Sequence, residues 1–481
     1  MNKDFKYIPK GDRKKILLIC DDMRVHSGIA TVAKEIVLHT AQHFNWAQIA
    51  GAINHPEKGK LFDLSSSINA DTGLTDSSVF LYPTDGYGNI ELVRSLIKKE
   101  NPDALFIITD PRYFMWLFNA EAEIRKNIPI MYLNIWDDYP APLYNKEFYE
   151  SCDLLMGISK QTVNINKIAL GDKAKNKVIK YLPHGLNHNI YRPLETTEEI
   201  EAMHKMKKHI FGEDEIDFIL FYNSRNIRRK QIPDTMWAFK MFLDGLPKEK
   251  ADRCRLLMHT EKIHDAGTDL PVIEELLFSD TYPNAIVFDT QKWSTSELNL
   301  LYNMSDCQIL LTCNEGWGLT LTEAMLAGNP IIANSTGGMQ DQMRFEDENG
   351  EWFTPSPEIP SNNTGRYKKH GEWAFPVYPA CRSIQGSPVT PYIFDDRCKP
   401  EDATDRIREV YDLGKEKRKE LGLKGREWCL SDEAGFNAKS QGENFIGAVN
   451  ELFSKWEPRE AFEVIDTDED IRKIQTHNLV Y

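Results

Sequence analysis

The chain has 481 residues, of which 41% are hydrophobic and 27% are charged, and its net charge is -15 at pH 7. Single hydrophobic cores stop growing near ~250 to 300 residues, so this length predicts two domains with a cleft between them. The composition excludes extended disorder and collagen-like repetition, and the negative charge disfavours non-specific binding to nucleic acid or to an anionic membrane surface.

The cysteine pattern and the first residues of the chain indicate the cellular compartment. Eight cysteines are scattered without a C-x-x-C pair, which signals neither a zinc ribbon nor a dense disulfide framework. The first residues, MNKDFKYIPKGDRKK, contain no apolar signal region, and no later stretch reaches the ~18 to 20 apolar residues of a membrane span. We therefore expect a cytoplasmic protein without a transmembrane segment.

The first part of the chain alternates strand and helix patterns. Residues 15–20 (KILLIC) form a short apolar run, which a polar loop and then apolar residues at helical spacing follow. Further strand-like runs occupy 104–109, 130–135 and 154–158. This alternation predicts a parallel sheet with helices on both faces.

A second series of apolar runs follows after residue 216. Its members are 217–222, 255–259, 285–288, 307–312 and 330–333. The two series predict an α/β protein with two doubly wound Rossmann-like domains that face a cleft. We place the boundary beside the Pro-bearing segment 182–195, which predicts an N-terminal domain at 1–194 and a C-terminal domain at 195–456.

The C-terminal third contains an irregular segment and a helical one. Residues 344–400 are rich in Pro, Gly, Asn and aromatic residues and are too long for an ordinary connection. We expect this insertion to serve a specific acceptor or a subunit contact. A helical run from 400 to 456 follows, and the acidic tail 457–481 is expected to pack back on the first domain.

The motif with the most chemical content is CNEGWGLTLTEAMLAGNPIIANSTGGMQD, residues 313–341, in which Glu315 and Glu323 are separated by seven residues. A strand ends at Thr312, a Gly-containing loop exposes backbone N–H groups, and a helix begins near Thr320. Such a helix N-terminus attracts a diphosphate. A plain amphipathic helix with solvated acids is the alternative for an isolated pair of glutamates.

This segment resembles the donor-binding signature of retaining GT-B glycosyltransferases, notably family four and the glycogen synthases. The resemblance implies that Glu323 binds the ribose hydroxyls of a nucleotide and that Glu315 binds hydroxyls of the donor sugar. It also implies donor contacts for the loop and helix start: Gly316, Trp317, Gly318, Leu319 and Thr320.

Two other segments match the same family. In residues 221–239 (FYNSRNIRRKQIPDTMWAF), Arg225 and Lys230 stand where relatives carry an Arg and a Lys five positions later. Two fixed cations after a strand would stabilise the charge of a departing diphosphate, although a solvated basic turn has the same composition. In residues 20–36, Gly28 occupies the loop between the first strand and helix, where relatives often have two adjacent glycines, and it would let the backbone approach the donor phosphate or the acceptor.

Two first-domain positions are weaker candidates. Asp137 in NIWDDYPAP follows a strand where relatives often place a His-Asp pair, and it would contact the acceptor or the reacting sugar. His184 in PHGLNHNIYRP resembles a residue of the family's hinge and would reach the cleft. An Asp at a strand end is just as often a helix cap, and a lone His is more often structural.

The resemblance implies sugar transfer from a nucleotide-sugar donor with retention of anomeric configuration, as a hexosyl- or pentosyltransferase. It also implies that the N-terminal domain, 1–194, binds the acceptor and that the C-terminal domain, 195–456, binds the donor. We expect metal independence and no cofactor, because no His, Cys or Asp cluster has metal-ligand spacing. The alternatives are a non-catalytic sugar-nucleotide-binding protein and a nucleotide-sugar epimerase on the same fold. The sugar, the nucleobase and the oligomeric state stay undetermined at this level.

The acceptor also stays open. A glycan, a lipid-linked sugar, a small molecule or a modified nucleic-acid base each fits the resemblance, and nucleic acid is expected only in that last role. Aromatic residues of the insertion suit stacking on sugar rings, but a buried core is the commoner use of such residues. They are Trp352, Phe353, Trp373, Phe375, Tyr378 and Tyr392.

Overall fold

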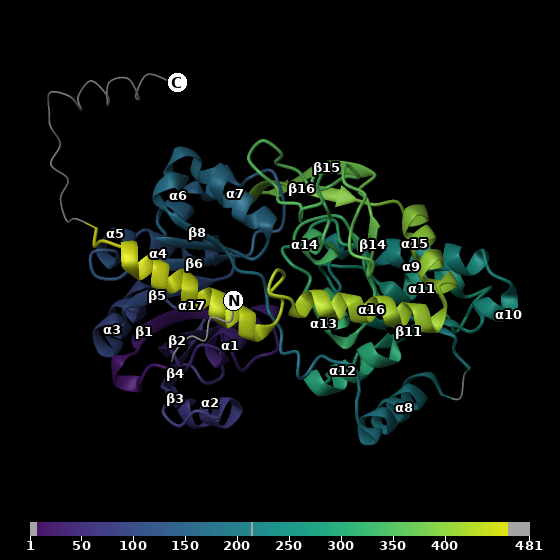
Figure 1. Ribbon diagram of the computed structural model, residues 1–481, viewed down its shortest axis with the longest axis horizontal. Helices are drawn as coiled ribbons and strands as arrows, with labels where there is room; N and C mark the ends of the chain where they lie inside the picture. The colour runs from purple at the N-terminus through teal and green to yellow at the C-terminus, as the bar shows by residue number, and fades with distance from the viewer. Residues whose placement is uncertain (1–6, 213–214, 460–481) are drawn as a thin grey trace.

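The computed structural model describes residues 7–212 and 215–459, which form two α/β domains side by side (Figure 1). Each domain is built on its own sheet, with helices on both faces. The predicted fold class is confirmed.

The first domain holds an eight-stranded sheet in the order β3-β4-β2-β1-β5-β6-β7-β8. All its neighbouring strands are parallel except β3 and β4. The strands are β1 (Lys14–Asp21), β2 (Phe44–Ala52), β3 (Phe62–Asp63), β4 (Val79–Asp85), β5 (Ala104–Ile108), β6 (Ile130–Asn134), β7 (Leu154–Gly157) and β8 (Val178–Tyr181). The α-helices are α1 (Gly28–Leu38), α2 (Ser65–Thr72), α3 (Ile90–Glu100), α4 (Met115–Phe118), α5 (Glu121–Ile124), α6 (Lys146–Glu150) and α7 (Lys160–Leu170).

The second domain holds a six-stranded parallel sheet in the order β11-β10-β9-β12-β13-β14. Its strands are β9 (Phe218–Asn223), β10 (Cys254–His259), β11 (Ile286–Asp289), β12 (Cys307–Leu310), β13 (Ile331–Asn334) and β14 (Ala374–Val377). The α-helices that follow the first domain are α8 (Thr197–Phe211), α9 (Ile232–Asp244), α10 (Lys248–Ala251), α11 (Leu270–Phe278), α12 (Thr295–Met304), α13 (Leu319–Ala327), α14 (Met339–Met343), α15 (Pro400–Asp412), α16 (Gly414–Leu430) and α17 (Ala438–Lys455).

The last helix differs from the expected domain assignment. Although α17 falls within the range predicted for the second domain, it lies across the first domain, against α1, β7 and β8 (Figure 1). The ring of Phe445 sits 5.1 Å from that of Phe106 and 6.0 Å from that of Phe44, so aromatic packing holds the helix there. The acidic tail, residues 457–481, was expected to pack back on the first domain. Most of these residues lie outside the described part of the chain.

The insertion 344–400 is structured. It adds β14 to the edge of the second sheet and forms an antiparallel hairpin from β15 (Cys381–Ser387) and β16 (Thr390–Arg397). Three of its aromatic residues, Phe353, Trp373 and Phe375, are buried in the hydrophobic core. These three aromatic residues therefore serve the hydrophobic core, as the commoner use of aromatic residues predicted, rather than stacking on a sugar ring.

Candidate functional site

The first glutamate of the motif, Glu315, lies between two cations. Glu315 stands between the end of β12 and the start of α13, and its Oε2 accepts a hydrogen bond of 2.8 Å from Arg229 and another from Lys230. Both cations belong to a 3-10 turn, Arg228–Lys230, in the segment that follows β9. Because β9 and β12 are parallel neighbours, their carboxyl ends meet at one edge of the sheet, where α/β proteins bind ligands.

Burial and charge compete at this cluster. Burial by itself raises the pKa of Glu315, but Arg229 and Lys230 outweigh that effect and hold the pKa at about 2. Burial lowers the pKa of Lys230, while Glu315 opposes the shift. The carboxylate is therefore ionised at neutral pH and compensates the two cations.

The first domain contributes Asp137 to the same place. Its Oδ1 accepts a 2.9 Å hydrogen bond from the backbone N–H of Gly316, and its Oδ2 lies 3.9 Å from Nε of Arg229. A Cβ at position 316 would stand 2.7 Å from the carbonyl oxygen of Ile135, so glycine permits this approach of the two domains. Burial raises the pKa of Asp137; Arg229 opposes the rise and Glu315 adds to it.

The N-termini of two helices, one from each domain, lie close together. Gly28 begins α1, and a Cβ there would stand 3.2 Å from Cδ1 of Leu319, the first residue of α13. Gly318 precedes α13 with a φ of +89°, a left-handed conformation that favours glycine. Thr320 follows in the first turn of α13. The positive ends of both helix dipoles are thus close together, which suits an anionic ligand.

The second glutamate of the motif lies in the wall behind this loop. Glu323 on α13 accepts a 2.5 Å hydrogen bond from the hydroxyl of Tyr302 on α12, and Tyr302 accepts another of 3.0 Å from Asn223. Burial raises the pKa of Glu323, and its bonds with Tyr302 and Tyr191 oppose that rise. These bonds set the position of the Glu323 carboxylate.

Three expected site residues lie differently from the prediction. Arg225 is exposed, and no side-chain hydrogen bond or ion pair of it occurs within the described residues, so Arg229 is the arginine that meets Glu315. Trp317 is 2% exposed and donates its indole N–H to Thr322. His184 is buried 6.1 Å from the Trp317 ring, and burial lowers its pKa to about 3. Trp317 and His184 thus form part of the packing behind the loop.

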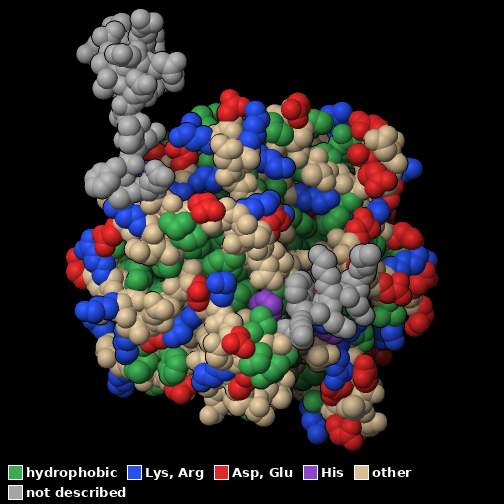
Figure 2. Space-filling view, turned by 60° about the vertical axis from the view of Figure 1, so that its left-hand side comes forward, with side chains coloured by type: hydrophobic (Ala, Val, Ile, Leu, Met, Phe, Trp, Pro, Cys, Tyr) green, Lys and Arg blue, Asp and Glu red, His purple; other side chains and the backbone are tan. Residues whose placement is uncertain are grey.

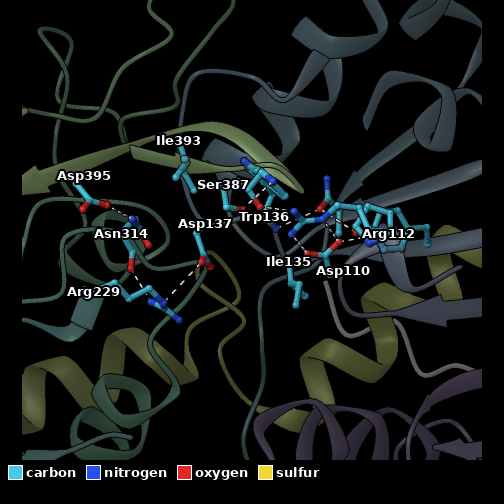
Figure 3. Close-up of a pocket in the computed structure, with 15 residues that line it drawn as sticks. Asp110, Arg112, Ile135, Trp136, Asp137, Arg229, Asn314, Ser387, Ile393 and Asp395 are labelled. Carbon is cyan, nitrogen blue, oxygen red and sulfur yellow. Dashed lines mark hydrogen bonds and ion pairs between the residues drawn. The ribbon is translucent and has the colours of Figure 1, made fainter. Parts of the chain in front are cut away.

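A cavity of about 380 Å³ adjoins Asp137 and Arg229 (Figure 3). Its walls come from the ends of β5 and β6, from the loop after β12, and from the hairpin β15–β16. Sequence reasoning missed Arg229 and most of the other polar lining, although Arg229 stands inside the basic run and Asp110 directly follows a predicted strand. The missed polar residues include Asp110, Arg112, Asn134, Arg229, Asn314 and Asp395.

Residues 279–359, which include Glu315 and Glu323, match the family model described as glycosyl transferases group 1. Alpha-monoglucosyldiacylglycerol synthase of Acholeplasma laidlawii is 26% identical over 182 residues, which are 37% of this chain and 41% of that protein. Trehalose synthase of Pyrococcus horikoshii is 30% identical over 98 residues, which are 20% and 24% of the two chains. The matched regions therefore span less than half of either relative.

Solved structures share the whole architecture. Sucrose-phosphate synthase from Thermosynechococcus elongatus aligns with a TM-score of 0.63 at 14% identity, covering 92% of this chain and all of the other. The Anabaena protein HepE, solved in complex with UDP-glucose, aligns with a TM-score of 0.60 at 12% identity, covering 91% of this chain and all of the other. At such identities the likeness shows the fold alone. The chain thus has the GT-B fold of these glycosyltransferases, and one segment of it is similar to the group 1 family.

Proposed function

We propose that this protein is a retaining glycosyltransferase that moves a sugar from a nucleotide-sugar donor onto a hydroxyl acceptor. The contact of Glu315 with Arg229 and Lys230 beside the N-terminus of α13 carries the proposal, because it joins an anion-binding feature to a sugar-binding carboxylate. This cluster lies in and beside the segment that matches the family model. A nucleotide-sugar donor is supported by the UDP-glucose named in the HepE complex.

In the proposed reaction, the bond between the anomeric carbon of the sugar and the diphosphate oxygen breaks, and a bond to the acceptor oxygen forms on the same face. The acceptor proton passes to the departing phosphate, so no nucleophilic residue is required. Lys230, Arg229 and the backbone N–H groups at the start of α13 stabilise the negative charge that develops on the leaving group.

The opposing domain completes the arrangement. Asp137 contacts both Gly316 of the donor-side loop and Arg229, so it bridges the domains next to the proposed reaction centre. Closed packing of the domains there excludes water, which would otherwise hydrolyse the donor. The proposed donor-binding group comprises Glu315, Glu323, Lys230, Arg229 and the backbone of residues 316–320.

A donor screen tests the proposal. Purified protein is mixed with UDP-, GDP-, ADP- and CMP-sugars, with and without EDTA, and thermal stabilisation and nucleotide release are measured together. We expect one donor to stabilise the protein and to release nucleotide slowly, with EDTA having no effect. Stabilisation without consumption would favour a non-catalytic binding protein, and conversion of the sugar without an acceptor would favour an epimerase.

Nucleic acid as an acceptor receives no support from the surface in view. On the described residues of the face in Figure 2, Lys and Arg side chains are interspersed with Asp and Glu, with no broad basic field of the kind that follows a phosphate backbone.

None of the helices in the described part of the chain has the length and hydropathy of a membrane span.

A further inference from the structure

The hairpin β15–β16 belongs to the second domain in sequence but is hydrogen-bonded to the first. The backbone N–H of Phe394 donates to the carbonyl of Tyr139 at 2.7 Å. The hydroxyl of Tyr144 donates to the carbonyl of Tyr392 at 2.9 Å, and the Tyr392 hydroxyl accepts from the N–H of Leu143 at 3.0 Å. The hairpin therefore spans the domain boundary as a fixed element.

A buried acid network holds the base of the hairpin. Arg382 of β15 donates to Asp396 of β16 at 2.7 Å, and Asn362 donates to Asp396 at 2.7 Å and to Asp138 of the first domain at 2.8 Å. Asp138 and Asp396 are both fully buried. Burial, and then the charge of Asp396, raise the pKa of Asp138 well above its usual range. The network ties the position of the hairpin to that of the first domain.

The cavity beneath the hairpin carries excess negative charge. Its two arginines are already paired, Arg112 with Asp110 and Arg229 with Glu315. Asp395 accepts a 2.7 Å hydrogen bond from the neutral amide of Asn314, and no ion pair of Asp395 occurs within the described residues. Figure 3 shows Asp395 and Asn314 on one side of the cavity, with Asp110 and Arg112 on the other.

The cavity also adjoins the proposed reaction centre. Asp137 lines it and accepts the N–H of Gly316, the residue that follows Glu315 in the donor-side loop. A molecule in the cavity would thus lie next to the donor sugar. Its volume of about 380 Å³ is at the lower end of the range for small-molecule sites, ~300 to 1,000 Å³.

We propose that the hairpin β15–β16 completes an acceptor subsite that selects a neutral saccharide over one carrying a phosphate. Carboxylate and amide oxygens accept hydrogen bonds from sugar hydroxyls, whereas the charge of Asp395 repels an added phosphate. This inference rests on the proposed function, since it names the acceptor class of that site. The hairpin supplies the selecting residue, although it belongs to the sequence of the donor domain.

The test compares hexoses with their 6-phosphates, because each pair differs only in the phosphate. Binding of glucose, mannose and galactose and of their 6-phosphates is measured by saturation-transfer NMR and by titration, and transfer is measured with any donor that the screen identifies. We expect at least one neutral hexose to bind about tenfold or more tightly than its phosphate, which corresponds to about 1.4 kcal/mol.

Two variants assign the selectivity to the hairpin. Asp395→Asn keeps the shape of the side chain and removes its charge, so we expect the preference for the neutral hexose to fall to about threefold or less. Asp405→Asn removes the same charge from an exposed position on α15 and serves as the matched control, with the wild-type preference retained. Thermal melts show that both variants are folded.

Several results would overturn the inference: equal or tighter binding of the phosphates, no binding of any neutral hexose, or an equal change in Asp405→Asn. Failure of the proposed function is a separate result: the donor screen would show neither donor binding nor nucleotide release. The NMR comparison of hexoses needs no donor, so it tests the acceptor subsite independently.

Discussion

The two walls of the cleft are assembled in different ways. The donor-side wall comes mainly from one continuous segment, residues 313–341, which follows the end of β12 and contains the loop and the start of α13. The opposite wall combines Asp110 after β5 and Asp137 after β6, both from the first domain. Asp395 joins the cavity beside Asn314, from a hairpin more than two hundred residues later in the chain than either aspartate. The first wall depends on local backbone geometry, whereas the second depends on how the two domains pack.

This contrast predicts that changes in the donor-side wall affect donor chemistry, whereas changes at the contact between the walls affect how the site is assembled. We expect Lys230→Ala to have the largest effect, a fall in turnover of about 100- to 1,000-fold, because a cation beside the leaving group is lost. Steady-state nucleotide release measures it, and a melting curve excludes unfolding. Full turnover in this variant would remove Lys230 from the proposed site.

Glu323→Ala tests the deeper part of the same wall. We expect nucleotide affinity to fall by about 10- to 100-fold, because a charged hydrogen-bonding partner of the ribose is lost. Titration with the nucleotide measures it. Tyr302→Phe serves as the comparison, since it removes the hydroxyl that donates to Glu323 and keeps the carboxylate. Unchanged affinity in Glu323→Ala would show that the motif has no ribose contact here.

Gly316→Ala tests the contact between the walls. A Cβ would stand 2.7 Å from the carbonyl oxygen of Ile135, so we expect the domains to shift and transfer to fall by about tenfold or more. Gly447→Ala is the control, because a Cβ at that position on α17 meets nothing within 4 Å and the change improves helix propensity. Equal activity of the two variants would mean that close approach at Gly316 is dispensable.

The pH dependence of stability reports the Glu315 cluster. The pKa of Glu315 in the folded state is about 2, below its ordinary value of 4.5, so its stabilising contribution is complete above about 4.5 and is lost as the pH falls towards 2. We expect the free energy of unfolding to fall more steeply over this range in wild type than in Glu315→Gln. Urea titrations between pH 6 and pH 3 measure the difference, and parallel slopes would contradict it.

Arg225→Ala should have the smallest effect, a change in turnover of about fivefold or less, because the side chain is exposed and makes no ion pair within the described residues. Nucleotide release measures it beside Lys230→Ala. A loss of turnover as large as that of Lys230→Ala would show that Arg225 has the role that the family resemblance implied.

Most strands could be predicted, and the exceptions have a physical cause. The runs at 15–20, 104–109, 130–135 and 217–222 correspond to β1, β5, β6 and β9. β2 escaped prediction because Asn45 and Gln48 interrupt its apolar pattern, yet both are buried, and Gln48 donates a 2.7 Å hydrogen bond to the carbonyl of Asp21. β14 was hidden in the segment read as irregular, since it contains Pro376 and lies at the edge of its sheet.

Local sequence specifies the arrangement of the donor-side wall, with Gly318 before α13, Glu315 in the loop and Glu323 one turn into the helix. Spacing of that kind follows from backbone hydrogen bonding within a few residues. The contact of Arg229 with Glu315 depends instead on tertiary packing, because the Arg229 carbonyl accepts a hydrogen bond from the N–H of Cys313, in the loop after the neighbouring strand. Tertiary packing also places Asp395 at the cavity beside Asn314, because this position depends on contacts between segments far apart in the chain.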